Sequence, residues 1–128
     1  GRTLKDALEK MIREYQTLSN LQVDLHYEWV DVDMDVMIED TIFRVIQESM
    51  TNAVRHGHAS QMSLHFFENE EDYLIELQDN GVGFETLTYG YGLKQMMERI
   101  SILGGQLQFE SRDGFFTRIS LPKYKEGR

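Results

Sequence analysis

Four polar side chains that could handle a metal-bound polyanion lie within one stretch of the sequence, residues 43–58. At roughly 100° per residue, the stretch reads as a helix whose polar set falls within an arc of about 100°, beside a mostly apolar stripe. The polar set is Glu48, Asn52, Arg55 and His56; the stripe is Ile38, Ile42, Val45, Ile46, Ser49 and Ala53. A carboxylate can orient water, an amide oxygen is a hard ligand for Mg²⁺, and guanidinium and imidazole groups can meet phosphate oxygens. By itself, the pattern fits a solvated amphipathic helix equally well.

Length and composition narrow the classes of protein. The 128 residues suffice for one domain, so we predict a single domain over residues 1–128; because Gly1 is not an initiator methionine, we expect it to be excised from a longer protein. With 27% charged and 41% hydrophobic residues, the composition is globular. The net charge of −9 argues against a nucleic-acid or anionic-membrane binder, which needs a basic face. No apolar run approaches the roughly 18 residues that span a bilayer.

Apolar periodicity predicts the elements that must position the polar set. A helix is expected over residues 4–18, and another over residues 93–103 that carries Met96, Met97, Ile100, Ile102 and Leu103. Alternating residues predict strands at 23–27, extended by Trp29, and at 62–66, 73–79, 107–109 and 115–121. This order indicates an α+β fold, a two-layer α/β sandwich with helices packed on one face of a mixed, mostly antiparallel sheet.

Two further stretches carry residues that could do chemistry. By the period of two, Asp79 points inward at the end of its strand and opens the segment DNGVGF at 79–84. A segment GYGL at 90–93 precedes a helix, where backbone N–H groups form an anion site. Separately both are weak signals, because Asn80-Gly81 is typical of a hairpin turn and GYGL of a simple loop.

Together and in this order, the three stretches resemble the Asn-containing helix motif, the D-x-G-x-G motif and the G-x-G motif of the GHKL ATPases. The runs QESMTNAVRH at 47–56, GLKQMMERI at 92–100 and LGG at 103–105 are similar to sensor histidine kinases of the subfamily that serves NarL-type response regulators. The resemblance covers residues 4–122. It implies a Bergerat fold and the catalytic, ATP-binding domain of a two-component kinase. Such a domain passes the γ-phosphate of Mg·ATP to a histidine on a separate dimerisation domain.

The resemblance also implies a role for each matching residue. Asp79 would accept a hydrogen bond from the adenine amine, with Thr117 beside it. Gly81 and Gly83 would let backbone approach the purine, with Val82 between them. The phosphates would be bound by Gly90, Tyr91, Gly92, Leu93 and Lys94, together with Arg55 and His56 of the helix. Asn52 would be the magnesium ligand and Glu48 the catalytic residue, close to the attacking group or a metal-bound water.

Some features depart from the family pattern. The lid between the second and third motifs is only residues 85–89, and Phe115-Phe116 stands where glycines often precede the threonine. None of His26, His56, His58 and His65 has the context of a phosphate acceptor, so we expect the catalytic and ATP-binding domain alone. The resemblance further implies a monomeric cytoplasmic domain whose parent is anchored in the bacterial cell membrane. Two alternatives remain: a serine protein kinase of the anti-sigma-factor type, and a non-catalytic ATP-regulated binding module. The run at 98–105 favours the histidine kinase.

Overall fold

The computed structural model describes residues 3–30, 32–83 and 92–123 of the chain. Within these ranges it contains three helices and five strands. In chain order they are α1 (Leu4–Leu18), β1 (Gln22–Tyr27), α2 (Val36–Arg55), β2 (Gln61–Glu68), β3 (Asp72–Asp79), α3 (Leu93–Ile102), β4 (Gln106–Ser111) and β5 (Phe115–Pro122).

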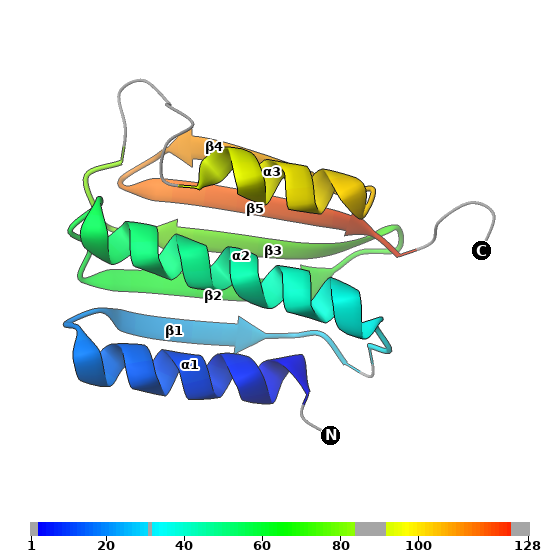
Figure 1. The fold of residues 1–128 in the computed structure, drawn as a ribbon, viewed down its shortest axis with the longest axis horizontal. Coiled ribbons are helices and arrows are strands. Elements are labelled where there is room, and N and C mark those ends of the chain that lie inside the picture. The colour runs from blue at the N-terminus through cyan, green and yellow to red at the C-terminus, as the bar shows by residue number, and fades with distance from the viewer. Residues whose placement is uncertain (1–2, 31, 84–91, 124–128) are drawn as a thin grey trace.

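The five strands form one sheet in the order β1-β2-β3-β5-β4. β1 pairs with β2 in parallel, and the other three pairs are antiparallel. All three helices lie on one face of this sheet (Figure 1). The expected two-layer α+β sandwich with a mixed, mostly antiparallel sheet is therefore confirmed.

Capping residues set where the first two helices begin. The Thr3 side chain accepts a hydrogen bond from the Asp6 N–H at 3.1 Å, and Asp35 accepts one from the Met37 N–H at 2.7 Å. These bonds satisfy backbone donors that have no partner within the helix. α2 begins at Val36, immediately after its aspartate cap, and contains the whole predicted stripe from Ile38 to Ala53; it ends at Arg55, before the predicted end at residue 58.

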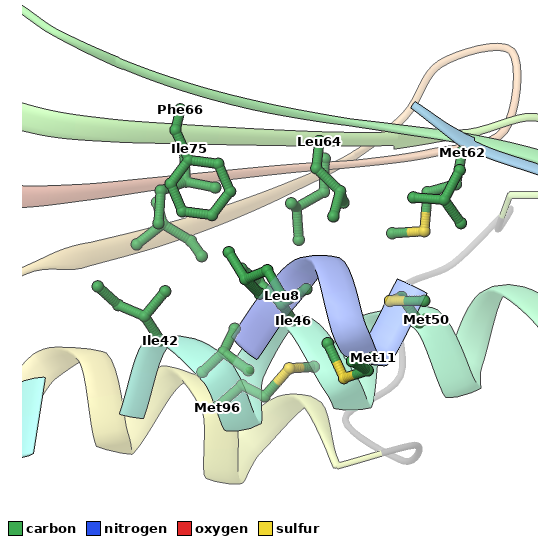
Figure 2. Close-up of a cluster of buried hydrophobic side chains, with 14 of the residues drawn as sticks. Leu8, Met11, Ile42, Ile46, Met50, Met62, Leu64, Phe66, Ile75 and Met96 are labelled. Carbon is green, nitrogen blue, oxygen red and sulfur yellow. The ribbon is translucent and has the colours of Figure 1, made fainter. Parts of the chain in front are cut away.

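The core lies between α2 and the middle of the sheet. Figure 2 shows Ile42, Ile46 and Met50 pointing from α2 toward the side chains of Met62 and Leu64 on β2. All five are buried, and burying a side chain of this size stabilises the fold by roughly 1.5–3 kcal/mol. The core thus fixes which side of α2 faces the sheet, and with it the direction of the polar flank beside that side.

Two apolar residues at the ends of elements do not continue the pattern of those elements. Trp29 does not extend β1, which ends at Tyr27; its indole N–H donates to the Phe67 carbonyl at 2.6 Å, and its ring packs edge-on against Phe66. The side chain of Ile102, at the end of α3, is 78% exposed and takes no part in the core. Both residues lie at or just beyond the end of an element, where periodicity no longer determines which way a side chain points.

None of the helices in the described ranges combines the length and the apolar character needed to cross a membrane.

Candidate active site

The three motifs, so far as the structure describes them, lie at one end of the sandwich. β3 ends there at Asp79 and β5 begins at Phe115, directly opposite it across the sheet. The same end holds the C-terminal end of α2 and the N-terminal end of α3 (Figure 1). Three motifs far apart in the sequence therefore meet at one place.

Asp79 is a buried acid with a divided task. Its side chain is 6% exposed and lies on the helix-covered face of β3 with Leu77, as expected. Oδ1 accepts hydrogen bonds from the N–H of Gly81 at 2.8 Å and of Phe115 at 3.0 Å. Neither bond uses Oδ2. One oxygen therefore holds two loops in place; the described residues make no hydrogen bond to the other, which could accept one from a ligand donor.

The central helix contributes its polar flank unevenly. Glu48 and Asn52 are half-buried beside the core-facing stripe, whereas Arg55 and His56 are exposed. The N–H groups of His56 and Gly57 both donate to the Asn52 carbonyl at 3.0 Å, which ends the helix one turn beyond the Asn52 side chain. Glu48 and Asn52 are thus placed at the site, and Arg55 and His56 stand at its solvent side.

Glu48 and Gly92 bring the first and third motifs into contact. Gly92 precedes α3 with a φ of 75°, a conformation that favours glycine. A Cβ at this position would collide with Oε1 of Glu48. Any side chain here would therefore displace the Glu48 carboxylate as well as strain the backbone.

The start of α3 offers backbone donors. Among the described residues no side chain caps this helix, and its first N–H groups lie at the positive end of the helix dipole. Leu93 is buried and anchors the helix in the core, while Lys94 is exposed. The predicted phosphate ligands Gly90 and Tyr91, and the short lid at residues 85–89, lie outside the described residues.

The structure gives a reason for the glycines of the second motif that the sequence did not reveal. A Cβ on Gly81 would lie 2.5 Å from the Gly57 carbonyl oxygen, and one on Gly83, whose φ is 68°, would lie 2.7 Å from the Gly114 carbonyl oxygen. Val82 donates its N–H to the Gly57 carbonyl at 3.0 Å and keeps its side chain exposed. Close packing of protein backbone therefore already requires both glycines, whether or not a purine approaches them.

Thr117 points inward, as predicted. It is buried on β5 opposite Leu77, on the helix-covered face that also carries Asp79. Thr117 is one step along this face from Phe115, which lies opposite Asp79. Both polar groups expected at the base thus occupy neighbouring strands at the same end.

Two residues that hold the site were not identified from the sequence. Gly114 was interpreted only as part of a tight turn, yet it is buried with a φ of 132°, and a Cβ there would overlap the Asp79 carbonyl oxygen. The Gln78 amide donates to the carbonyls of Asp79 at 2.7 Å and Arg112 at 3.0 Å, from the other face of β3. The Asp-Gly pair was a turn signal, but contacts across strands leave no local pattern.

The donor set fits magnesium only when phosphates share the coordination. Within the described ranges, no group of three His, Cys, Asp or Glu side chains could hold a metal ion alone. Asn52 supplies one hard amide oxygen, and Mg²⁺ is commonly held by one or two protein oxygens together with substrate phosphates and waters. A Mg·ATP complex therefore suits this site better than a resident metal.

A family model of the histidine kinase-, DNA gyrase B- and HSP90-like ATPases matches residues 37–125. The chain belongs to this family. The match contains all three motifs, from the central helix through Asp79 to Thr117, and family membership assigns ATP as the ligand of the chain.

Three curated relatives are sensor kinases. The chain is 32% identical over 126 residues to the signal transduction histidine-protein kinase/phosphatase UhpB of Salmonella typhimurium, covering 94% of this chain and 25% of that protein. It is 32% identical to the sensor protein VraS of Staphylococcus epidermidis and 29% to the sensor histidine kinase LiaS of Bacillus subtilis, covering 94% of this chain and 35% and 34% of those proteins. The chain thus spans a quarter to about a third of these relatives.

Solved structures show the same fold. The histidine kinase AdeS of Acinetobacter baumannii superposes with a TM-score of 0.80 at 19% identity, over 95% of this chain and 64% of that one. The ATP-binding domain of PrrB from Mycobacterium tuberculosis superposes with a TM-score of 0.75 at 20% identity, over 94% and 93%. At these identities, the likeness establishes the fold alone.

Proposed function

We propose that this chain is the catalytic and ATP-binding domain of a two-component sensor histidine kinase, a single domain over residues 1–128. It passes the γ-phosphate of Mg·ATP to a histidine on a separate dimerisation domain. The observation that carries the proposal is the contact between the Glu48 carboxylate and Gly92, because it joins the central helix to the start of α3 at the end of the sheet where the buried Asp79 lies (Figure 1). A base, phosphates and a reacting group can then be held at one end of the sheet.

Asp79 and Thr117 support the base end of the bound nucleotide. Since Oδ1 of Asp79 is committed to Gly81 and Phe115, we assign Oδ2 to the exocyclic amine of adenine. Guanine carries a carbonyl at that position and has no donor to offer. A buried acceptor left without its donor costs binding free energy, which favours adenine over guanine.

The phosphate end lies between α2 and α3. Asn52 contributes its amide oxygen to magnesium, and the first N–H groups of α3 bind phosphate oxygens. Magnesium neutralises phosphate charge when bound, which matters in a chain of net charge −9. Glu48 orients the attacking group or a water, and Lys94, Arg55 and His56 attract the triphosphate from the solvent side.

The acceptor histidine belongs to another domain. His26 lies on β1 and His65 on β2, while His56 caps α2 and His58 follows it. His65 is bonded to Glu28, on the face of the sheet away from the helices. We therefore place the acceptor histidine on the kinase's dimerisation domain. The full-length protein would phosphorylate a NarL-type response regulator. This domain would lie in the cytoplasm, in a parent protein anchored in the membrane.

The test supplies the missing acceptor. The chain is mixed with labelled Mg·ATP and the helical dimerisation domain of a kinase of this subfamily, and acid-labile phosphate on that domain is measured. Asn52→Ala should keep nucleotide binding and lose magnesium-dependent transfer. Gln47→Ala, which removes an exposed amide from the same helix, is the matched control and should transfer normally.

Each other outcome has a distinct meaning. Acid-stable phosphate on a supplied protein substrate would identify a serine kinase. Tight ATP binding without transfer to any acceptor domain would identify a binding module. If the chain ignores Mg·ATP in a titration, the assignment of the site is wrong.

A further inference from the structure

Asn80 uses its whole side chain to hold a different segment of the chain. Its Oδ1 accepts hydrogen bonds from the N–H of Ser60 at 2.8 Å and of Gln61 at 2.9 Å. Its Nδ2 donates to the Ser60 hydroxyl at 2.9 Å, and its backbone N–H donates to the Gln61 carbonyl at 3.1 Å. An asparagine in an ordinary Asn-Gly turn bonds its own loop; this one joins the loop after β3 to the start of β2.

A second link lies one step further along. Val82 donates to the Gly57 carbonyl at 3.0 Å, and Gly81 packs so closely on Gly57 that no side chain would fit between them. Residues 80–82 and residues 57–61 therefore form one hydrogen-bonded unit. We call this unit the Asn80 bracket.

The Asn80 bracket connects two parts of the candidate site. Residues 57–61 continue directly from the end of α2, which carries Glu48 and Asn52. Residues 80–82 continue from Asp79, whose Oδ1 depends on the position of the Gly81 N–H. The distance between the magnesium end and the adenine end of the site is thus set partly by the bonds of Asn80.

We propose that Asn80 is a positioning residue for nucleotide binding, acting through Gly81 and the segment after α2. This inference rests on the function proposed above. Asn80 is exposed, and its side-chain bonds are made to Ser60 and Gln61, so it holds the site in its binding geometry without touching the nucleotide. A site that is ordered before binding does not spend binding free energy on ordering loops.

The chain contains a matched control for this role. At the opposite end of the sheet, Oδ1 of Asn69 accepts hydrogen bonds from the N–H of Glu71 at 2.9 Å and of Asp72 at 2.7 Å. Both asparagines are exposed, and both satisfy two backbone donors with one amide oxygen. Asn69→Ala and Asn80→Ala therefore each remove an amide oxygen that accepts from two backbone N–H groups, the first far from the site and the second beside it, where the bond to the Ser60 hydroxyl is lost as well.

The experiment measures Mg·ATP affinity by calorimetry and the thermal unfolding midpoint for both alanine variants and for Asn80→Asp. Asn80→Ala should weaken Mg·ATP binding by about tenfold, while Asn69→Ala binds as the unsubstituted chain does. Asn80→Asp should restore affinity, because one carboxylate oxygen can accept from the Ser60 and Gln61 N–H groups and the other from the Ser60 hydroxyl. Hydrogen exchange of those two amides should speed up in Asn80→Ala and slow again in Asn80→Asp.

The possible outcomes distinguish a failure of this inference from a failure of the proposed function. If the unsubstituted chain does not bind Mg·ATP, the proposed function fails. If it binds, and Asn80→Ala matches Asn69→Ala in affinity, the positioning role is wrong and the function stands. If Asn80→Ala unfolds, Asn80→Asp decides: weak binding by a folded Asn80→Asp with protected Ser60 and Gln61 amides would contradict the proposal.

Discussion

The two ends of the sandwich are filled in opposite ways. At the end away from Asp79, space is filled by rings: Trp29 packs against Tyr27, Phe66 and Tyr73, with ring centroids 4.9–5.8 Å apart. Aromatic side chains bury large areas and pack edge-on or tilted. This end of the molecule is held by side-chain volume.

The site end is held largely by backbone; the ring pair of Phe109 and Phe115, with centroids 5.5 Å apart, lies beside it. Gly57 lies against Gly81, and Gly114 lies against Asp79, each with no room for another carbon atom. Hydrogen bonds to Asp79 and from Gln78 connect the same loops. Large rings would fill the space that a ligand needs. Glycine packing and hydrogen bonds leave that space open, so the site end can be rigid and still accept a nucleotide.

The largest effect should come from emptying the aromatic end. Trp29→Ala should cost about 3–5 kcal/mol in the free energy of unfolding, because a large buried ring leaves a cavity. The Mg·ATP affinity of the folded protein should not change, as the ring lies at the opposite end of β3. Urea denaturation and calorimetry at low temperature measure the two quantities, with Leu18→Ala at an exposed position as control. A parallel loss of affinity would contradict the separation of the two ends.

At the site end, one added methyl group should do most damage at Gly114. Gly114→Ala should cost about 3 kcal/mol in stability and lose nucleotide binding, since its Cβ would overlap the Asp79 carbonyl at an unfavourable φ. Gly104→Ala is the control: its φ is 79°, but the nearest atom to a Cβ is a Pro122 carbon at 3.8 Å. That variant should lose only about 1 kcal/mol, the cost of the left-handed conformation, and bind Mg·ATP normally. Equal losses of affinity in the two variants would exclude a special role for the Gly114 contact.

Asp79→Asn should separate the two oxygens of this side chain. The amide oxygen can still accept from Gly81 and Phe115, so the unfolding midpoint should change little. ATP binding should weaken by about 2 kcal/mol, or about thirtyfold, because an NH₂ group would then face the adenine amine. Inosine triphosphate lacks that amine, so it should bind the unsubstituted chain more weakly than ATP does. It should bind Asp79→Asn as well as ATP does. Normal ATP affinity in Asp79→Asn would overturn the adenine assignment.

The smallest effect concerns the pKa of Tyr27 at the aromatic end. Burial, followed by the nearby charge of Glu39, raises the pKa of the Tyr27 hydroxyl from 10.0 to about 12. The folded state therefore holds a proton that the unfolded state releases, and the corresponding stability is present below pH 10 and is lost as the pH rises toward 12. Tyr27→Phe should flatten the fall of the unfolding midpoint over this range, with no change in slope at neutral pH. An identical alkaline slope in both proteins would show that Tyr27 does not titrate as described.

Most of the fold could be predicted from periodicity. The helix at residues 4–18 and the inward faces of β3 and β5 follow from spacings of 3.6 and 2.0, which report which side of an element is apolar. Patterns fail where an element ends, as at Trp29 and Ile102. They also miss Phe116, which is buried on the face of the sheet away from the helices because the Arg112 guanidinium lies 3.9 Å above its ring. Alternation along a strand does not register a cover that comes from a residue in the preceding turn.

The sequence proposed the site as a set of residues and not as a geometry. The three motifs singled out an acid, an amide and glycines because chemistry restricts which residue types can serve, and their roles stay predictions. The partner of each glycine could not be predicted, since Gly81 meets Gly57 and Gly92 meets Glu48 only once the chain has folded. The role of Asn80 was hidden for the same reason, because its Asn-Gly pair suggested a local turn.

The sequence by itself therefore determined the elements, their buried faces and the types of residue available for nucleotide chemistry. Each of these depends on neighbours within a few positions along the chain. Only the tertiary structure decided the strand order, the contact between Glu48 and Gly92, and the two hydrogen bonds that Oδ1 of Asp79 accepts. Those features depend on atoms separated by dozens of residues, and the packing of a whole core brings such atoms together.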